Sequence, residues 1–68
     1  AQTGYVALTD RQKAVLQAMV EGLSRKMIAD KLSIHIDTVG DHIKEIYRKL
    51  HVNSAPEAVR EAIQKKII

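Results

Sequence analysis

The stretch that decides the fold is Ser24–Leu50, SRKMIADKLSIHIDTVGDHIKEIYRKL. Its first part places three apolar residues on one helical face: Ile28, Ala29 and Leu32. After a break at residues 33–34, a second apolar face follows the i, i+4, i+7, i+11 spacing of a longer helix: Val39, Ile43, Ile46 and Leu50. This spacing predicts helices over about residues 25–32 and from residue 36 or 37 to residue 50. Two helices joined by so short a turn are typical of a helix-turn-helix.

A further helix is predicted before this unit. Thr9 and Gln12 have the spacing of a capping box, so the helix should run over about residues 10–21. Gly22 is placed to end it, because glycine adopts a left-handed backbone without steric cost. Four apolar residues should be buried by this helix: Val15, Leu16, Met19 and Val20.

A last helix is predicted after the polar turn at residues 51–54. Ser54, Pro56 and Glu57 supply its cap, a first-turn proline and a capping-box acid, and it should extend to about Lys66. Ser24 is the natural N-cap of the second helix, whereas His35 is a poor N-cap for the third. With no credible strand, the sequence predicts an all-α four-helix bundle that contains the helix-turn-helix at about residues 25–44.

The size and composition allow one small domain. Residues 8–68 are predicted to form it, and residues 1–7, which show no periodicity, to be the end of a linker. A start at Ala1 instead of Met suggests a piece of a longer protein, although Met is also commonly removed before Ala. There is no Cys, hence no disulfide or thiolate metal site, and no signal or membrane-spanning segment. We therefore expect a cytoplasmic protein. Its net charge of +3 favours an anionic partner only weakly.

The proposed helix-turn-helix meets three steric demands. Ala29 is small where the helices cross, Ser33 is a permissive turn residue, and Val39 locks the second helix in place. The alternative is a plain helical hairpin in a bundle core. The second helix of a true helix-turn-helix can lie in the DNA major groove.

Residues 8–63 resemble the DNA-binding domain of LuxR-type (LuxR/FixJ, GerE-like) bacterial transcription regulators. The matching positions include polar residues that packing alone would not dictate: Ser24, Thr38 and His42. The resemblance implies sequence-specific binding to double-stranded DNA by the effector domain of a response regulator, as a dimer on paired half-sites. RNA polymerase is a further partner that such a regulator would have. This chain departs from the family at Gly40, where a Lys is usual, and at His35, where Ser or Thr is common.

The outer face of the third helix holds the candidate base-reading residues. Helical geometry points five side chains away from the core: Asp37, Asp41, Lys44, Glu45 and Arg48. Of these, Lys44 and Arg48 can donate to guanine, and Asp41 can accept from cytosine. The resemblance adds Gly40 to the base-facing positions, although it has no side chain to donate with. The alternative is a solvated face of ion pairs at i, i+3 and i, i+4 spacing.

Phosphate contacts are predicted at the helix starts and their flanks. Hydroxyls and free N–H groups at a helix N-terminus suit phosphate oxygens. The predicted phosphate-contacting residues are Ser24, Arg25, Lys26, Thr38, His42 and Lys49. Two of them have structural alternatives, since Ser24 can be a plain N-cap and His42 a partly buried, hydrogen-bonded side chain.

The fourth helix is predicted to form the dimer surface. Its apolar stripe is wider than a thin core requires: Ala55, Ala58, Val59, Ala62 and Ile63. Part of this stripe should stay exposed in the monomer. The alternative is that packing against the first and third helices uses all of Val59 and Ile63.

Two other function classes compete with this prediction. Region 4 of a sigma factor has a similar helix-turn-helix, but the resemblance here extends through the fourth helix. A helical protein-interaction module without DNA binding is the second alternative. An enzyme is not expected, because the three histidines are dispersed and neither paired carboxylates nor a glycine-rich phosphate loop is present. No cofactor or metal is predicted.

Overall fold

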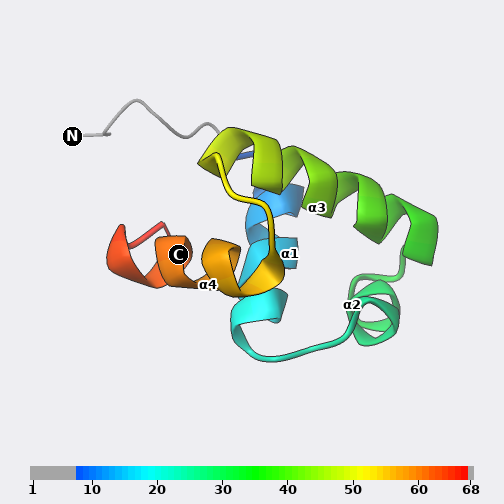
Figure 1. Cartoon of the computed structure of the whole chain (residues 1–68). Helices are drawn as coiled ribbons and strands as arrows, with labels where there is room; N and C mark the ends of the chain where they lie inside the picture. Colours follow the sequence, from blue (N-terminus) through cyan, green and yellow to red (C-terminus); the bar gives the residue numbers. More distant parts are fainter. Residues whose placement is uncertain (1–7, 68) are drawn as a thin grey trace.

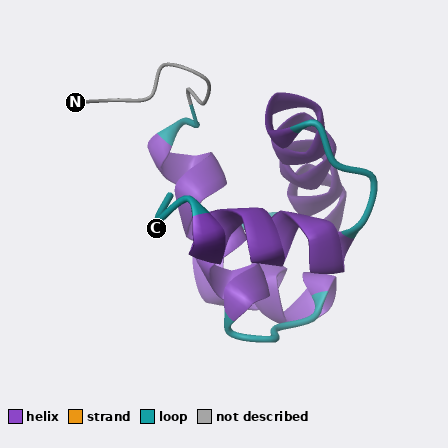
Figure 2. Ribbon diagram, turned by 60° about the vertical axis from the view of Figure 1, so that its left-hand side comes forward, coloured by secondary structure: helices purple, strands orange, loops and turns teal. Residues whose placement is uncertain are grey.

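The computed structural model describes residues 8–67, and the predicted linker at residues 1–7 lies outside them. The described residues form four helices and no strand (Figures 1 and 2). In chain order these are α1 (Asp10–Val20), α2 (Arg25–Leu32), α3 (Ile36–Leu50) and α4 (Ala55–Gln64). The predicted all-α class and the order of the helices are therefore confirmed.

The predicted N-caps at three helices are in place. The Thr9 hydroxyl accepts from the Gln12 backbone N–H at 3.0 Å, and the Gln12 side-chain oxygen accepts from the Thr9 N–H at 3.1 Å, which completes the capping box. Ser24 caps α2 and Ser54 caps α4 in the same way, by accepting the backbone N–H three residues later. Each cap satisfies a backbone donor that has no partner within its own helix.

The start of α3 differs from the prediction. His35, judged a poor cap, acts as the N-cap: its ring Nδ1 accepts from the Asp37 N–H at 3.1 Å. A neutral imidazole nitrogen carries a lone pair, so it can replace the hydroxyl or carboxylate of an ordinary cap.

Three left-handed residues end the first three helices. Gly22 has φ 87°, and both Ser33 and His51 have φ 58°. At the end of α2, the Ile34 N–H donates to the Ala29 carbonyl at 3.0 Å, which closes the turn into α3. Ser33 is thus the permissive turn residue that the spacing predicted. The last helix ends at Gln64, two residues earlier than predicted, because Lys66 has φ 53°.

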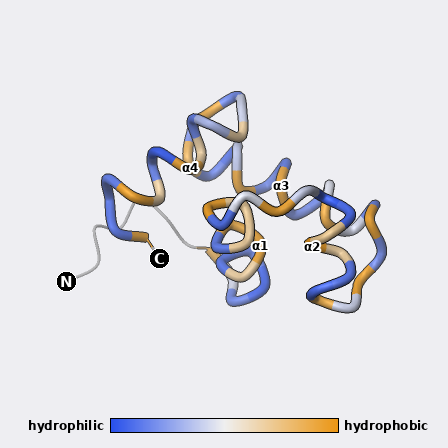
Figure 3. Tube along the Cα trace, turned by 90° about the horizontal axis from the view of Figure 1, so that it is seen from below, coloured by the Kyte–Doolittle hydropathy of each residue, from blue (hydrophilic) through white to orange (hydrophobic). Residues whose placement is uncertain are grey.

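The core is drawn from all four helices and from Leu8 before α1. Its fully buried large side chains are Val15, Leu16, Ile28, Val39 and Ile46. Two residues expected in the core, Met19 and Val20, are only half-buried, while Ala18 and Gln12 are buried without having been predicted. Figure 3 shows hydrophobic and hydrophilic residues alternating along each helix, because one face of the helix is buried and the other is exposed.

Helix α3 is the longest helix among the described residues, and it lies across the other three. It contacts α1 and α2 extensively and α4 less so. Ala29, only 7% exposed, lies on α2, which packs against α3, in agreement with the predicted need for a small residue. One face of α3 is therefore buried over its whole length, from Val39 to Leu50, and the opposite face is left for solvent or a ligand.

Candidate nucleic-acid interface

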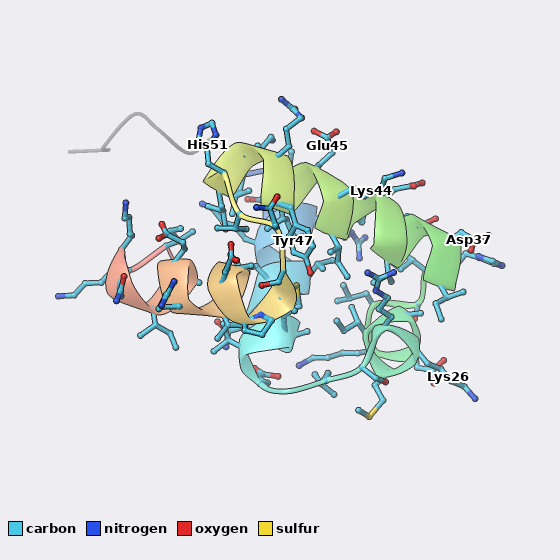
Figure 4. All side chains as sticks on the ribbon, viewed as in Figure 1. Lys26, Asp37, Lys44, Glu45, Tyr47 and His51 are labelled. Carbon is cyan, nitrogen blue, oxygen red and sulfur yellow. The ribbon has the colours of Figure 1, made fainter. Side chains whose placement is uncertain are left out.

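The exposed face of α3 carries the side chains that the helical geometry predicted. All five are exposed: Asp37, Asp41, Lys44, Glu45 and Arg48. Figure 4 shows Lys44 and Glu45 projecting from the middle of α3 and Asp37 from its start. An exposed helix with cationic donors along one side can present them to the edges of bases in the major groove.

One of the predicted ion pairs forms on this face. The Arg48 guanidinium donates through Nε to Glu45 Oε1 at 3.2 Å and through Nη2 to the same oxygen. These hydrogen bonds, and the positive charge of Arg48, lower the pKa of Glu45, and the same contact raises the pKa of Arg48. Arg48 is thus held by a neighbour on its own helix. By contrast, the described residues place no ion-pair or hydrogen-bond partner on Lys44 or Asp41, so both keep their side chains available to a ligand.

The predicted phosphate-contacting residues lie on two sides of this face. Ser24, Arg25 and Lys26 belong to the start of α2, which packs against α3, and all three are exposed. Thr38, His42 and Lys49 lie along α3 itself and are half-buried. The structure therefore brings two groups of polar side chains to the flanks of the outward-facing residues, as contacts to the two strands beside a groove would require.

The start of α2 is better suited to an anion than the start of α3. Within the described chain no hydrogen bond uses the backbone N–H groups of Arg25 and Lys26, and the Ser24 hydroxyl accepts the Met27 N–H at 3.2 Å but can still donate. At α3, the N–H groups of Asp37 and Thr38 are both taken by His35. Free N–H groups were predicted at both helix starts. Among the described residues, the structure leaves those of Arg25 and Lys26 free at α2 and only that of Ile36 free at α3.

Lys49 has a structural partner that the sequence did not suggest. Its ammonium donates to the side-chain oxygen of Gln12 at 2.8 Å, and Gln12 is only 7% exposed. This bond ties the end of α3 to the capping box at the start of α1. A phosphate contact by Lys49 remains a prediction, and it would have to be made alongside this internal bond. The T-x-x-Q capping box pointed to Gln12, but its distant partner could not be read from local spacing.

A second unexpected contact joins α2 to α3. A Cβ placed on Gly40 would lie 3.8 Å from Nη1 of Arg25, so the guanidinium of Arg25 lies beside α3 within van der Waals contact of that position. Beside it is an open hollow of about 450 Å³, lined by Arg25, Ile36, Asp37, Gly40, Asp41 and Lys44. Ile36, 43% exposed, was not predicted as a surface residue of this site.

The predicted dimer stripe on α4 needs a correction. Ala58 and Ala62 are fully buried in the core, packed where α4 meets the rest of the bundle, so a second copy of the chain cannot reach them. Ala55 and Ile63 are exposed, Ile63 by 60%, and Val59 is half-buried. The alternative that packing inside the bundle uses all of Ile63 is therefore wrong. A dimer surface on α4 would consist of Ala55, Val59 and Ile63.

Other kinds of site find no support in the described part of the chain. Residues 8–67 contain no group of three or more His, Cys, Asp or Glu side chains that could hold a metal ion. No helix there is long and apolar enough to cross a bilayer.

Comparison with known proteins agrees with this geometry. The family described as bacterial regulatory proteins, luxR family, matches residues 6–62. The transcriptional regulatory protein YdfI of Bacillus subtilis is 40% identical over 67 residues, which are 98% of this chain and 32% of that protein. The transcriptional regulatory protein DegU of Brevibacillus brevis is 42% identical over 84% of this chain and 24% of its own length.

A solved structure has the same fold. It is that of the response regulator ChrA of a heme-sensing two-component system, with a TM-score of 0.88 and 39% identity over 91% of this chain and 31% of that one. The chain thus spans a third or less of the relatives that it matches. Family, fold and the packing of α2 against α3 agree: the chain belongs to the LuxR family of bacterial regulatory proteins and is a helix-turn-helix DNA-binding domain.

Proposed function

We propose that this domain is the DNA-binding output unit of a cytoplasmic response regulator, and that it binds paired half-sites as a dimer. The response regulator ChrA, of whose chain this domain covers 31%, supports that context. In such a protein a second domain would receive the signal and this domain would select the operator. Bound to the operator, the dimer would be placed to contact RNA polymerase.

The observation that carries the proposal is the two-sided character of α3. Its inner face, with Val39 and Ile46 fully buried, fixes the helix rigidly to the bundle. Its outer face leaves Lys44 and Asp41 without partners among the described residues. A helix held in this way can enter a major groove about 12 Å wide with its side chains already oriented. The open N–H groups at the start of α2 would then bind a phosphate beside the groove.

The dimer surface follows from the exposed row on α4. Ala55, Val59 and Ile63 are spaced four residues apart, so they form one ridge on α4 beside the row of buried alanines. Such a ridge can pack against its own copy across a two-fold axis, which would set two α3 helices about 34 Å apart on DNA. One half-exposed isoleucine per chain buries little apolar area, so we expect the dimer to form on DNA and to be weak without it.

The test uses duplexes recovered by selection from a library of randomised double-stranded DNA. One duplex carries two half-sites and one carries a single half-site. The wild-type domain should bind the paired duplex cooperatively. Ile63→Glu should bind the two half-sites of that duplex independently, and its affinity for the single half-site should equal that of wild type.

The control is Gln64→Glu, which adds the same charge at the next exposed position. It should keep cooperative binding. If Ile63→Glu folds and remains as cooperative as Gln64→Glu, the dimer surface is not on α4. If no duplex is enriched over the starting library, binding to specific DNA sequences by this domain is disproved.

A further inference from the structure

We infer that Arg25, on α2, is a specificity-determining residue that reaches the major groove across Gly40 and reads a guanine next to the base contacted by Lys44. The inference rests on the proposed function, because it assumes that α3 enters the groove. It changes the predicted role of Arg25 from a phosphate contact to a base contact.

The first step is that the backbone conformation at residue 40 does not require a glycine. Gly40 lies in the interior of α3, and Gly22 is the only glycine with a positive φ among the described residues. Glycine in a helix interior destabilises the helix relative to alanine. Glycine also differs from other residues in the space that it leaves beside the helix. The atom nearest to a Cβ built on Gly40 is Arg25 Nη1, at 3.8 Å. A side chain longer than alanine would compete with the guanidinium for this space.

The second step is that the guanidinium is not engaged elsewhere. Within residues 8–67, no hydrogen bond or ion pair holds Arg25, in contrast to Arg48, which is bonded to Glu45. Arg25 thus lies against the exposed side of α3 with its five N–H donors available.

The third step is the chemistry of the hollow beside Gly40. Arg25 and Lys44 contribute cations to its lining, and Asp37 and Asp41 contribute carboxylates. An arginine can donate to O6 and N7 of guanine at once, and a carboxylate can accept from the amino group of cytosine. Donors and acceptors at the same hollow therefore match a G·C pair better than an A·T pair. The position of Lys44 in the middle of α3 can be followed in Figure 4.

The experiment compares the base preferences of variants on the same randomised duplex library. Wild type should recover a half-site with an invariant G·C pair. Arg25→Ala should lose the preference at that pair and bind the wild-type half-site about 10- to 100-fold more weakly, the range for one bidentate contact. Arg25→Lys keeps the charge but not the planar fork, so it should bind scrambled duplex like wild type and still lose the preference.

The glycine is tested by side-chain length. Gly40→Gln should lose the same base preference as Arg25→Ala because its side chain displaces the guanidinium, and Gly40→Ala should have a smaller effect. The matched control is Arg60→Ala, which removes an exposed arginine from α4. It should recover the wild-type half-site. Circular dichroism of each variant checks that the helices are retained.

Three results would overturn the inference. The first is that Arg25→Ala recovers the full wild-type half-site and weakens binding to every duplex equally, which would make Arg25 a phosphate contact. The second is that Gly40→Gln keeps the G·C preference, which would show that Arg25 does not need the space beside Gly40 to reach the base. In both cases wild type still selects a half-site, so the proposed function stands. Failure of wild type to enrich any sequence would contradict both.

Discussion

Replacing Ser33 by glycine should stabilise the domain, because Ser33 ends α2 with φ 58° and ψ 43°. A left-handed backbone costs a residue with a Cβ about 1–2 kcal/mol. Glycine avoids that cost but loses more backbone freedom on folding, about 0.5–1 kcal/mol. The midpoints of the two ranges differ by about 0.75 kcal/mol, so we expect a net gain of about 0.5–1 kcal/mol. In a domain of this size the melting temperature should rise by roughly 2–8 °C.

The assay is thermal and urea unfolding followed by far-ultraviolet circular dichroism. Ser33→Ala is the control, since it keeps the Cβ and removes a hydroxyl that forms no hydrogen bond within the described residues. It should lie within about 0.5 kcal/mol of wild type. Ser33→Val should be less stable than either, because a β-branched residue tolerates the left-handed region poorly. If Ser33→Gly melts below wild type, the turn does not have this conformation and the account of the helix-turn-helix is wrong.

Three further predictions concern α3 and its contacts. Lys44→Ala should lower affinity for the selected half-site by about 1–3 kcal/mol and relax one base position, whereas a loss equal on all sequences would make Lys44 a phosphate contact. Ala29→Leu should cost about 1–3 kcal/mol in urea unfolding by overpacking the α2–α3 crossing, and a variant that unfolds like wild type would show that the helices do not approach closely there. Glu45→Gln should release Arg48 and raise affinity for scrambled duplex at low salt, and anisotropy titrations that show no change would mean that Arg48 lies outside the interface.

The local elements of this fold could be predicted because their signals are local. The capping box at Thr9, the serine caps and the apolar spacing of α3 each depend on residues within a few turns of one another. His35 was missed as a cap because histidine is not a usual N-cap residue, and its ring happens to be oriented toward the Asp37 N–H.

Contacts between distant segments could not be derived in this way. The bond from Lys49 to Gln12 spans 37 positions, and the approach of Arg25 to Gly40 depends on how α2 crosses α3. Helical periodicity grouped Ala58 with Val59 and Ile63 on α4, but the direction of packing decided that the alanine is buried and the isoleucine exposed. The resemblance to a family predicts an interface on α3 but does not give its individual contacts.

The most direct test of the account is a map of backbone amide chemical shifts when the labelled domain binds a single half-site duplex. A single half-site excludes changes caused by dimer formation on α4. The account predicts the largest shifts at residues 24–26 and along the exposed side of α3, from Asp37 to Arg48, with α4 nearly unchanged. Large shifts on the outer faces of α1 and α4, with α3 unaffected, would contradict it.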